Sequence, residues 1–201
     1  MATAQWQPSL LDVGTPTDFD PTFDGARRRF LGSGAWVDLV PGWVAGADAL
    51  FEHVLAAGKW RSRTRRMWDN VVDEPRLTTG GWDDPPPPLP AMADALSGRY
   101  GLDLSQVSAN LYRDGADSVA WHGDTSGRKR ETTVVAILSL GEPRRFLLRP
   151  KGGGRSIRFT PAHGDLLVLG GTAQRTFDHS VPKVSQAGAR ISVMFREPGV
   201  F

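Results

Sequence analysis

The sequence predicts a mainly β protein of the α+β class, with a double-stranded β-helix (jelly roll) as its core. From residue 105 onward, short apolar segments alternate with turn residues, whereas helical patterns occur only earlier. About eight successive strands without helices between them are typical of two packed sheets. The length of 201 residues suits one hydrophobic core. We therefore expect a single domain over residues 1–201.

The residues before 105 divide into an N-terminal arm and a helical region. Residues 1–35 are rich in Asp, Gly, Pro and Thr and have weak periodicity, so we expect an extended arm. Apolar residues at helical spacing predict helices over 46–58 and 89–99, with a glycine at or just beyond each end. Residues 59–82 have the pattern of strands and loops. We expect both helices to pack outside one of the sheets.

The jelly-roll core is predicted over residues 105–197. A Lys-Gly-Gly-Gly segment at 151–154 predicts a hairpin turn between two of its strands. The expected strands lie near 106–112, 118–122, 132–140, 144–149, 155–160, 165–169, 176–181 and 189–196.

Composition narrows the possible chemistry. The chain has no cysteine, so any metal must be bound by His, Asp or Glu. Its net charge is +2 with a pI of about 9.3, and the positive charge is mostly clustered arginine. Arginine suits phosphate contacts, although each cluster also fits a solvated surface. We find no secretory signal and no apolar segment long enough to cross a bilayer, so we expect a cytoplasmic protein without membrane contact.

The segment His122-Gly123-Asp124 is the first candidate for chemistry. Residues two apart on a strand point to the same face, which would place an imidazole beside a carboxylate. A further histidine, His179, follows at the end of a predicted strand. Two histidines and one carboxylate form the facial triad that binds iron(II) and leaves positions open. Because His-x-Asp alone also fits a surface pair, the assignment depends on this downstream context.

Polar side chains on two predicted strands give a candidate anion site. Apolar and polar residues alternate along 190–196, so Arg190 and Arg196 share a face. An arginine inside a barrel requires an anion, because an unpaired buried charge is very costly. Asn110 and Tyr112 share a face of an earlier strand and offer neutral groups that can orient a carboxylate. The alternative is two ordinary strands with solvent-facing polar sides.

Taken in order, these residues resemble the pattern of the AlkB family of nucleic-acid demethylases over about residues 105–197. The resemblance implies an Fe(II)- and 2-oxoglutarate-dependent dioxygenase that uses O₂, oxidises an alkyl group on a base of DNA or RNA, and releases an aldehyde. The implied metal-binding and catalytic residues are His122, Asp124 and His179. The implied 2-oxoglutarate-binding residues are Asn110, Tyr112, Arg190 and Arg196, with Arg190 at the distal carboxylate and Asn110 and Arg196 nearer the keto-acid end. We expect a monomer that takes alkylated nucleic acid as its partner.

The resemblance also implies a substrate lid, which would lie within residues 36–104. A base that is flipped out of a duplex suits an aromatic face with cations nearby. The candidates for substrate contact are Trp68, Arg76, Trp82, Arg145 and Arg149, although each tryptophan also fits a place in the core. Family members often have Asn and Thr where this chain has Ser192 and Met194. They also often have acidic residues where Thr125-Ser126-Gly127 stands, so base preference does not transfer.

Two other functions remain open from the sequence. A 2-oxoglutarate-dependent hydroxylase of a protein or small molecule would have the same metal site, and the Trp and Arg content of 60–82 favours nucleic acid over it. A non-catalytic nucleic-acid-binding jelly roll would not need the three candidate iron ligands. The sequence leaves open DNA or RNA, single or double strand, and methyl or etheno adducts. We expect His163 and His53 to be structural.

Overall fold

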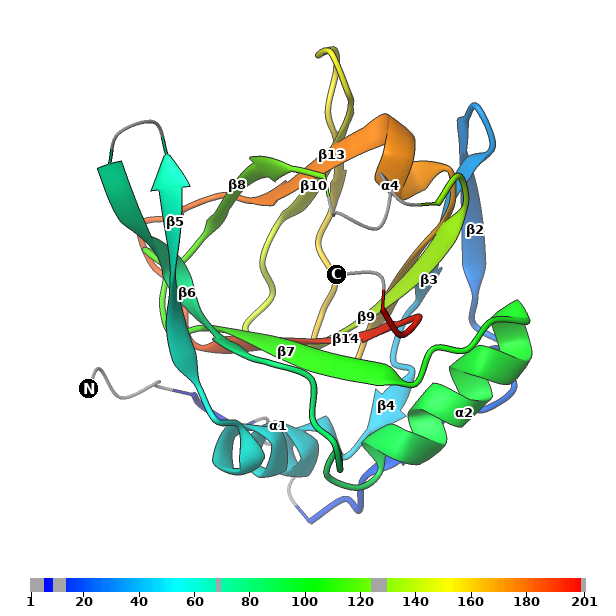
Figure 1. Cartoon of the computed structure of the whole chain (residues 1–201). Helices are drawn as coiled ribbons and strands as arrows, with labels where there is room; N and C mark the ends of the chain where they lie inside the picture. The colour runs from blue at the N-terminus through cyan, green and yellow to red at the C-terminus, as the bar shows by residue number, and fades with distance from the viewer. Residues whose placement is uncertain (1–5, 9–13, 68–69, 124–129, 200–201) are drawn as a thin grey trace.

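Two β-sheets packed face to face dominate the computed structural model, which describes residues 6–8, 14–67, 70–123 and 130–199 (Figure 1). The larger sheet has eight strands in the order β2 (Arg27–Gly32), β3 (Ala35–Val40), β12 (Leu166–Gly171), β9 (Thr133–Gly141), β14 (Arg190–Arg196), β7 (Gln106–Tyr112), β6 (Asn70–Thr79) and β5 (Arg61–Met67). The smaller sheet has four, in the order β11 (Ile157–Phe159), β10 (Phe146–Pro150), β13 (Phe177–Val181) and β8 (Val119–His122). Two short strands, β1 (Asp18–Phe19) and β4 (Val44–Ala45), pair separately.

The predicted mainly β jelly roll is confirmed. Each of the strands expected after residue 105 is present, with bounds that differ by a few residues at most. Four of them, β12, β9, β14 and β7, are adjacent in the larger sheet, and the other four form the smaller one. Residues 151–154 lie between β10 and β11, which pair as an antiparallel hairpin. The two layers are therefore built by the alternation and turn residues that predicted them.

Two features differ from the expectations. We expected residues 1–35 to form an extended arm, and this is wrong for residues 27–32. They form β2, which pairs with β3 as an edge strand of the larger sheet. Most residues of β2 are exposed, so the strand has no apolar alternation to reveal it. The run of strands is also interrupted, because the short helix α4 (Ala173–Thr176) lies between β12 and β13. The larger sheet extends beyond the four strands of the predicted core, through β3 and β2 on one side and through β6 and β5 on the other.

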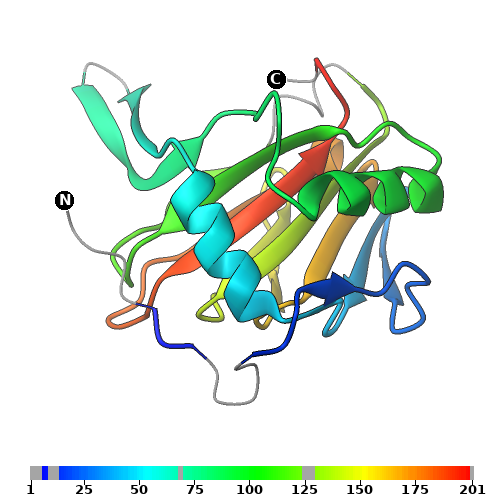
Figure 2. The same ribbon diagram turned by 90° about the horizontal axis from the view of Figure 1, so that it is seen from below.

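Two helices cover the outer face of the larger sheet, as predicted (Figure 2). They are α1 (Ala47–Ala57), which Gly58 caps, and α2 (Leu89–Tyr100), which ends at Gly101 in the left-handed region with φ 67°. The apolar side of β14, formed by Ile191, Val193 and Phe195, is fully buried in the same cluster as the helices. The opposite side of β14 faces the smaller sheet, where a second apolar cluster lies.

Trp6 near the N-terminus packs against the loop before β12 and against α1. Its ring centroid lies 4.8 Å from that of Phe51 and 5.0 Å from that of His163. The Nδ1 atom of His163 accepts a hydrogen bond from the Gly141 amide at 2.8 Å. Its Nε2 atom lies 2.9 Å from Asp48 Oδ1, a polar contact between the imidazole and the carboxylate. His163 thus has a structural environment, as expected.

The hairpin of β5 and β6 forms one edge of the larger sheet and extends beyond it (Figure 1). Its strand β6 pairs with β7 through Leu77, Thr78 and Thr79. The hairpin thus lies beside the strand that carries Asn110 and Tyr112, and its residues fall within 36–104, where we expect the substrate lid. Within the described ranges, no helix is both long enough and apolar enough to cross a membrane.

Candidate active site

A small cavity between the two sheets gathers most of the predicted site residues. Its volume is about 60 Å³, which suits a small polar ligand rather than a whole nucleotide. The residues of the predicted site that line it are Arg76, Asn110, Tyr112, His122, His179, Arg190 and Arg196. They come from both sheets, and β6 near the edge of the larger sheet contributes Arg76.

Two histidines lie side by side on the smaller sheet. His122 on β8 is directly opposite His179 on β13, and their ring centroids are 4.3 Å apart. The Nδ1 atom of His122 is 2.8 Å from the Ala120 carbonyl oxygen. Because a carbonyl only accepts, Nδ1 must carry the proton, which leaves Nε2 as the basic nitrogen for a metal. His179 is buried, and its ring stacks on Phe146 at a centroid distance of 5.4 Å.

The third predicted metal ligand, Asp124, lies outside the described residues. Within the described part of the chain, no group of three or more His, Cys, Asp or Glu side chains is gathered as a metal site. The described part therefore contributes two oriented imidazoles, and Asp124 follows His122 by one intervening glycine. Neutral imidazoles in this arrangement fit iron(II), which accepts two histidines and one carboxylate.

Arg190 forms the cationic end of the cavity. It is 2% exposed, its Nη2 atom donates to Ser139 Oγ at 3.0 Å, and its guanidinium lies 5.3 Å from the centre of the Tyr112 ring. Burial lowers the pKa of Arg190, the Tyr112 phenol opposes this, and nearby Arg144 adds to the lowering. Since a guanidinium stays charged in proteins, the charge must be stabilised by a ligand or a partner. None of the described residues that line the cavity is acidic, so the site fits an anion.

The face of β14 beyond Arg190 is polar but lacks the Asn and Thr of many relatives. Ser192 and Met194 stand there, and both line the cavity together with Arg196. The Asn110 amide nitrogen lies 3.1 Å from the Met194 sulfur, across the pairing of β7 with β14. A thioether is a weak acceptor, so it holds Asn110 in place while leaving the amide available to a stronger acceptor.

Arg76 connects the hairpin of β5 and β6 to the cavity. Its guanidinium donates to the Tyr112 hydroxyl at 3.5 Å and to the Glu74 carboxylate at 3.3 Å. Burial opposes its charge, but Tyr112 and Glu74 outweigh this effect, and the pKa of Arg76 is raised. The structure thus places this predicted substrate-binding residue against Tyr112, which is predicted to bind 2-oxoglutarate.

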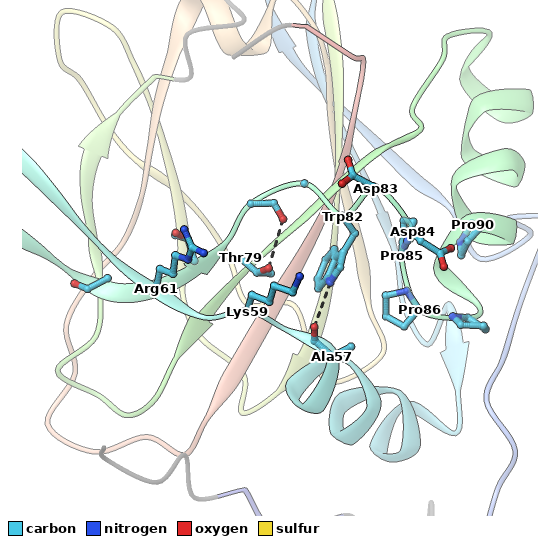
Figure 3. Close-up of a pocket in the computed structure, with 15 residues that line it drawn as sticks. Ala57, Lys59, Arg61, Thr79, Trp82, Asp83, Asp84, Pro85, Pro86 and Pro90 are labelled. Atoms are coloured by element: carbon cyan, nitrogen blue, oxygen red, sulfur yellow. Dashed lines mark hydrogen bonds between the residues drawn. The ribbon is translucent and has the colours of Figure 1, made fainter.

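Trp82 lies away from the cavity, in a separate open groove of about 930 Å³ (Figure 3). The groove runs along the end of α1 and the proline-rich segment at 85–90, with Lys59 and Arg61 on one side. The Trp82 indole N–H donates to the Ala57 carbonyl at 3.4 Å, and the ring packs on the core cluster of the helices. The structure therefore does not bring Trp82 together with the histidines.

Of the remaining substrate candidates, Arg145 directly precedes β10 of the smaller sheet and Arg149 lies on it. Trp68 lies outside the described residues. Arg145 is exposed and does not line the cavity. Arg149 lies 4.2 Å from the centre of the Trp121 ring and 3.9 Å from Asp178. Arg149 and Trp121 thus form a cation–aromatic pair at the strand that carries His122.

Two residues of this region were not found from the sequence. Gln174 on α4 lines the cavity and is 2% exposed, but a helix of four residues has no pattern that would reveal it. Arg144 is also 2% exposed and donates to the backbone carbonyls of Asp114, Asp117 and Pro182. Arg144 precedes β10, and its burial depends on carbonyl groups that are distant in the sequence, so no local pattern reveals it.

Two histidines paired across one sheet of a jelly roll, opposite a buried arginine on the other, are typical of non-haem iron oxygenases. The chain belongs to the 2OG-Fe(II) oxygenase superfamily, which matches residues 50–196. This confirms the predicted enzyme class, a dioxygenase with iron(II) as its metal and 2-oxoglutarate and O₂ as co-substrates.

Within this superfamily the chain is AlkB-like. It is 29% identical over 186 residues to alpha-ketoglutarate-dependent dioxygenase alkB homolog 3 of Bos taurus, covering 80% of this chain and 65% of the relative. It is 33% identical over 146 residues to DNA oxidative demethylase ALKBH2 of Arabidopsis thaliana, covering 60% of this chain and 46% of the relative. The chain thus spans only part of the length of these relatives.

Solved structures support the fold. The structure of OsALKBH1 superposes with a TM-score of 0.61 at 15% identity, covering 85% of this chain and 100% of that chain. A 2OG-Fe(II) oxygenase family oxidoreductase from Burkholderia pseudomallei gives a TM-score of 0.55 at 17% identity, covering 80% of this chain and 84% of that chain. At such low identity these likenesses concern the fold alone.

Proposed function

We propose that this protein removes alkyl groups from N-alkylated bases of DNA or RNA, converting 2-oxoglutarate and O₂ to succinate and CO₂ and releasing an aldehyde. The observation that carries the proposal is the cavity in which His122 and His179 lie opposite the buried, cationic Arg190. Relatives named as DNA oxidative demethylases support the choice of nucleic acid.

The residues of the larger sheet would bind the co-substrate. Arg190 would pair with one carboxylate of 2-oxoglutarate, because its charge is buried and lacks an acidic neighbour in the described part of the cavity wall. Tyr112 would orient the same carboxylate, held by Arg76 at its hydroxyl. Asn110 and Arg196 would contact the keto-acid end.

The residues of the smaller sheet would hold the metal through the Nε2 atom of His122 and the ring of His179, together with Asp124. Iron bound there supplies the activation of O₂ that oxidises the alkyl carbon. The protein's own contribution is placement, since the target carbon must lie close to the metal and water must be excluded. The lid hairpin of β5 and β6 borders this cavity through Arg76, so we propose that it closes over the alkylated base.

The test is an aerobic incubation with iron(II), 2-oxoglutarate and an oligonucleotide that contains 1-methyladenine. We expect mass spectrometry to show loss of one CH₂ unit per lesion, together with succinate. The matched control is His122→Ala, which should lose both products, while His53→Ala, an exposed helix residue, should retain them. Succinate without repair would favour another adduct or the hydroxylation of a protein or small molecule. Neither product from iron-loaded protein would contradict the enzyme proposal.

A further inference from the structure

Gln174 is an unusual feature of the cavity wall. Its side chain is 2% exposed, it comes from the short helix α4, and it lines the same cavity as the two histidines and Arg190. Neither its amide oxygen nor its amide nitrogen has a hydrogen-bond partner among the described residues. One acceptor oxygen and two donor hydrogens of this amide are therefore buried beside the site without hydrogen-bond partners among the described residues.

A buried amide without partners is unfavourable. A donor or acceptor left without a partner destabilises a fold, so buried polar groups are nearly always hydrogen-bonded. An apolar residue of the same size would pack in this wall more favourably, as Val135, Ile137 and Phe146 do nearby. The amide is thus best explained by a ligand that enters the cavity and supplies its partners.

The strand register shows which end of the cavity Gln174 occupies. Along the larger sheet, Phe195 on β14 pairs with Ala136 on β9, which pairs with Val168 on β12. Strand β12 continues from there to Gly171, in the direction in which β14 reaches Arg196, and α4 follows directly. Gln174 therefore lies toward the Arg196 end, opposite the end that Arg190 forms.

A lysine connects α4 to the metal-binding segment. The ammonium group of Lys151 donates to the Gln174 backbone carbonyl at 3.1 Å. The same ammonium lies 2.9 Å from where a Cβ atom on Gly123 would stand, in the His122-Gly123-Asp124 segment. One side chain thus touches both segments, which places α4 beside the histidine side of the cavity.

We propose that Gln174 is a positioning residue whose side-chain amide donates a hydrogen bond to the keto-acid carboxylate of 2-oxoglutarate, the end that binds the metal. This inference rests on the proposed function, because it requires that co-substrate in the cavity. A carboxylate is the chemistry that an amide N–H and the guanidinium of Arg196, which lines the same cavity, recognise. Gln174 thereby helps to fix the orientation of the keto acid at the metal.

The test measures binding without turnover. Protein loaded with Mn(II) is titrated calorimetrically with N-oxalylglycine, a stable analogue with the same two ends, and the melting temperature is measured without ligand. We expect Gln174→Leu to weaken binding about 10-fold, since a hydrogen bond to a charged group is lost. We expect Gln174→Glu to weaken it further, because a carboxylate would face a carboxylate. Ligand-free Gln174→Leu should melt at the same temperature or a few degrees (~2–4 °C) higher.

The matched control is Gln106→Leu. Gln106 also has a buried amide oxygen without a partner among the described residues, but it does not line the cavity, so its substitution should leave binding unchanged. Unchanged affinity in Gln174→Leu, or tighter binding by Gln174→Glu than by Gln174→Leu, would overturn the proposal. So would a lower melting temperature of ligand-free Gln174→Leu, which would indicate a structural contact. Failure of the wild-type protein to bind N-oxalylglycine would instead contradict the proposed function itself.

Discussion

The two faces of strand β14 are both buried, yet they are buried for different reasons. Ile191, Val193 and Phe195 point toward α1 and α2 and are fully enclosed by other apolar side chains. Arg190 points toward the smaller sheet and is almost equally buried, but its wall contains hydrogen-bonding groups and no acidic residue among those described. One face is stabilised by the fold alone, and the other requires something that the fold does not supply.

This difference separates stability from binding on one strand. Apolar burial contributes to folding whether or not a ligand is present. A buried cation without a carboxylate is unfavourable for folding and becomes favourable when an anion binds. Substitutions on the two faces should therefore have different effects, which the following experiments test.

The largest effect is expected on the outer face. Phe195→Ala removes a fully buried ring and should lower the free energy of unfolding by about 3–5 kcal/mol, measured by urea denaturation. The fraction that remains folded should still bind N-oxalylglycine with nearly normal affinity. A variant that loses affinity without losing stability would contradict the separation of the two faces.

The complementary substitution is Arg190→Met on the inner face. Affinity of the Mn(II)-loaded protein for N-oxalylglycine should fall by at least about 30-fold, because truncating one partner of a buried charge pair typically costs about 2–5 kcal/mol. The free energy of unfolding without ligand should stay unchanged or rise, since an uncompensated buried charge is removed. Destabilisation as large as that of Phe195→Ala would show that Arg190 already has a structural partner.

A smaller effect is expected where a polar group is satisfied within the fold. His163→Phe removes the acceptor of the Gly141 amide and the contact with Asp48, while the ring contact with Trp6 is retained. The unfolding free energy should fall by about 1–3 kcal/mol, because buried polar groups lose their partner. Calorimetric titration should find N-oxalylglycine binding unchanged. Weaker binding would mean that this cluster is coupled to the site.

The smallest effect is expected at the rim. Arg149→Ala removes the cation over Trp121 and should weaken binding of a methylated single-stranded oligonucleotide a few-fold (~2–5-fold), with a shallower dependence on salt. Fluorescence anisotropy over a series of salt concentrations measures both quantities. The matched control, Arg175→Ala, replaces an exposed arginine of α4. Equal losses in the two variants would indicate only a general charge effect.

The parts of the molecule that sequence predicted well are those with a local pattern. Alternation along 190–196 correctly separated the two faces of β14, and turn residues located the strands around it. Helix α1 was visible because its apolar residues recur at helical spacing. In each case the pattern follows from burial on one side, which a short segment records by itself.

Features that depend on distant contacts were missed. Strand β2 carries exposed arginines and has no apolar alternation. Its extended conformation is stabilised by backbone pairing with β3, a contact that its own sequence does not reveal. Trp82 was a candidate for base stacking, but composition does not distinguish a tryptophan beside a base from one that packs on a helix end. Gln174 is brought to the cavity by the crossing from β12 to β13. Its role therefore depends on tertiary structure that no local pattern encodes.

The most direct test is the visible absorption of the anaerobic protein with iron(II) and 2-oxoglutarate, because a keto acid bound to iron(II) would produce a charge-transfer band. We expect the band to appear on addition of 2-oxoglutarate and to be absent in His122→Ala. We also expect an oligonucleotide with 1-methyladenine to change the band, while the unmethylated oligonucleotide has a smaller effect. No band at saturating iron(II) and 2-oxoglutarate would contradict the assignment of this cavity as the metal and co-substrate site.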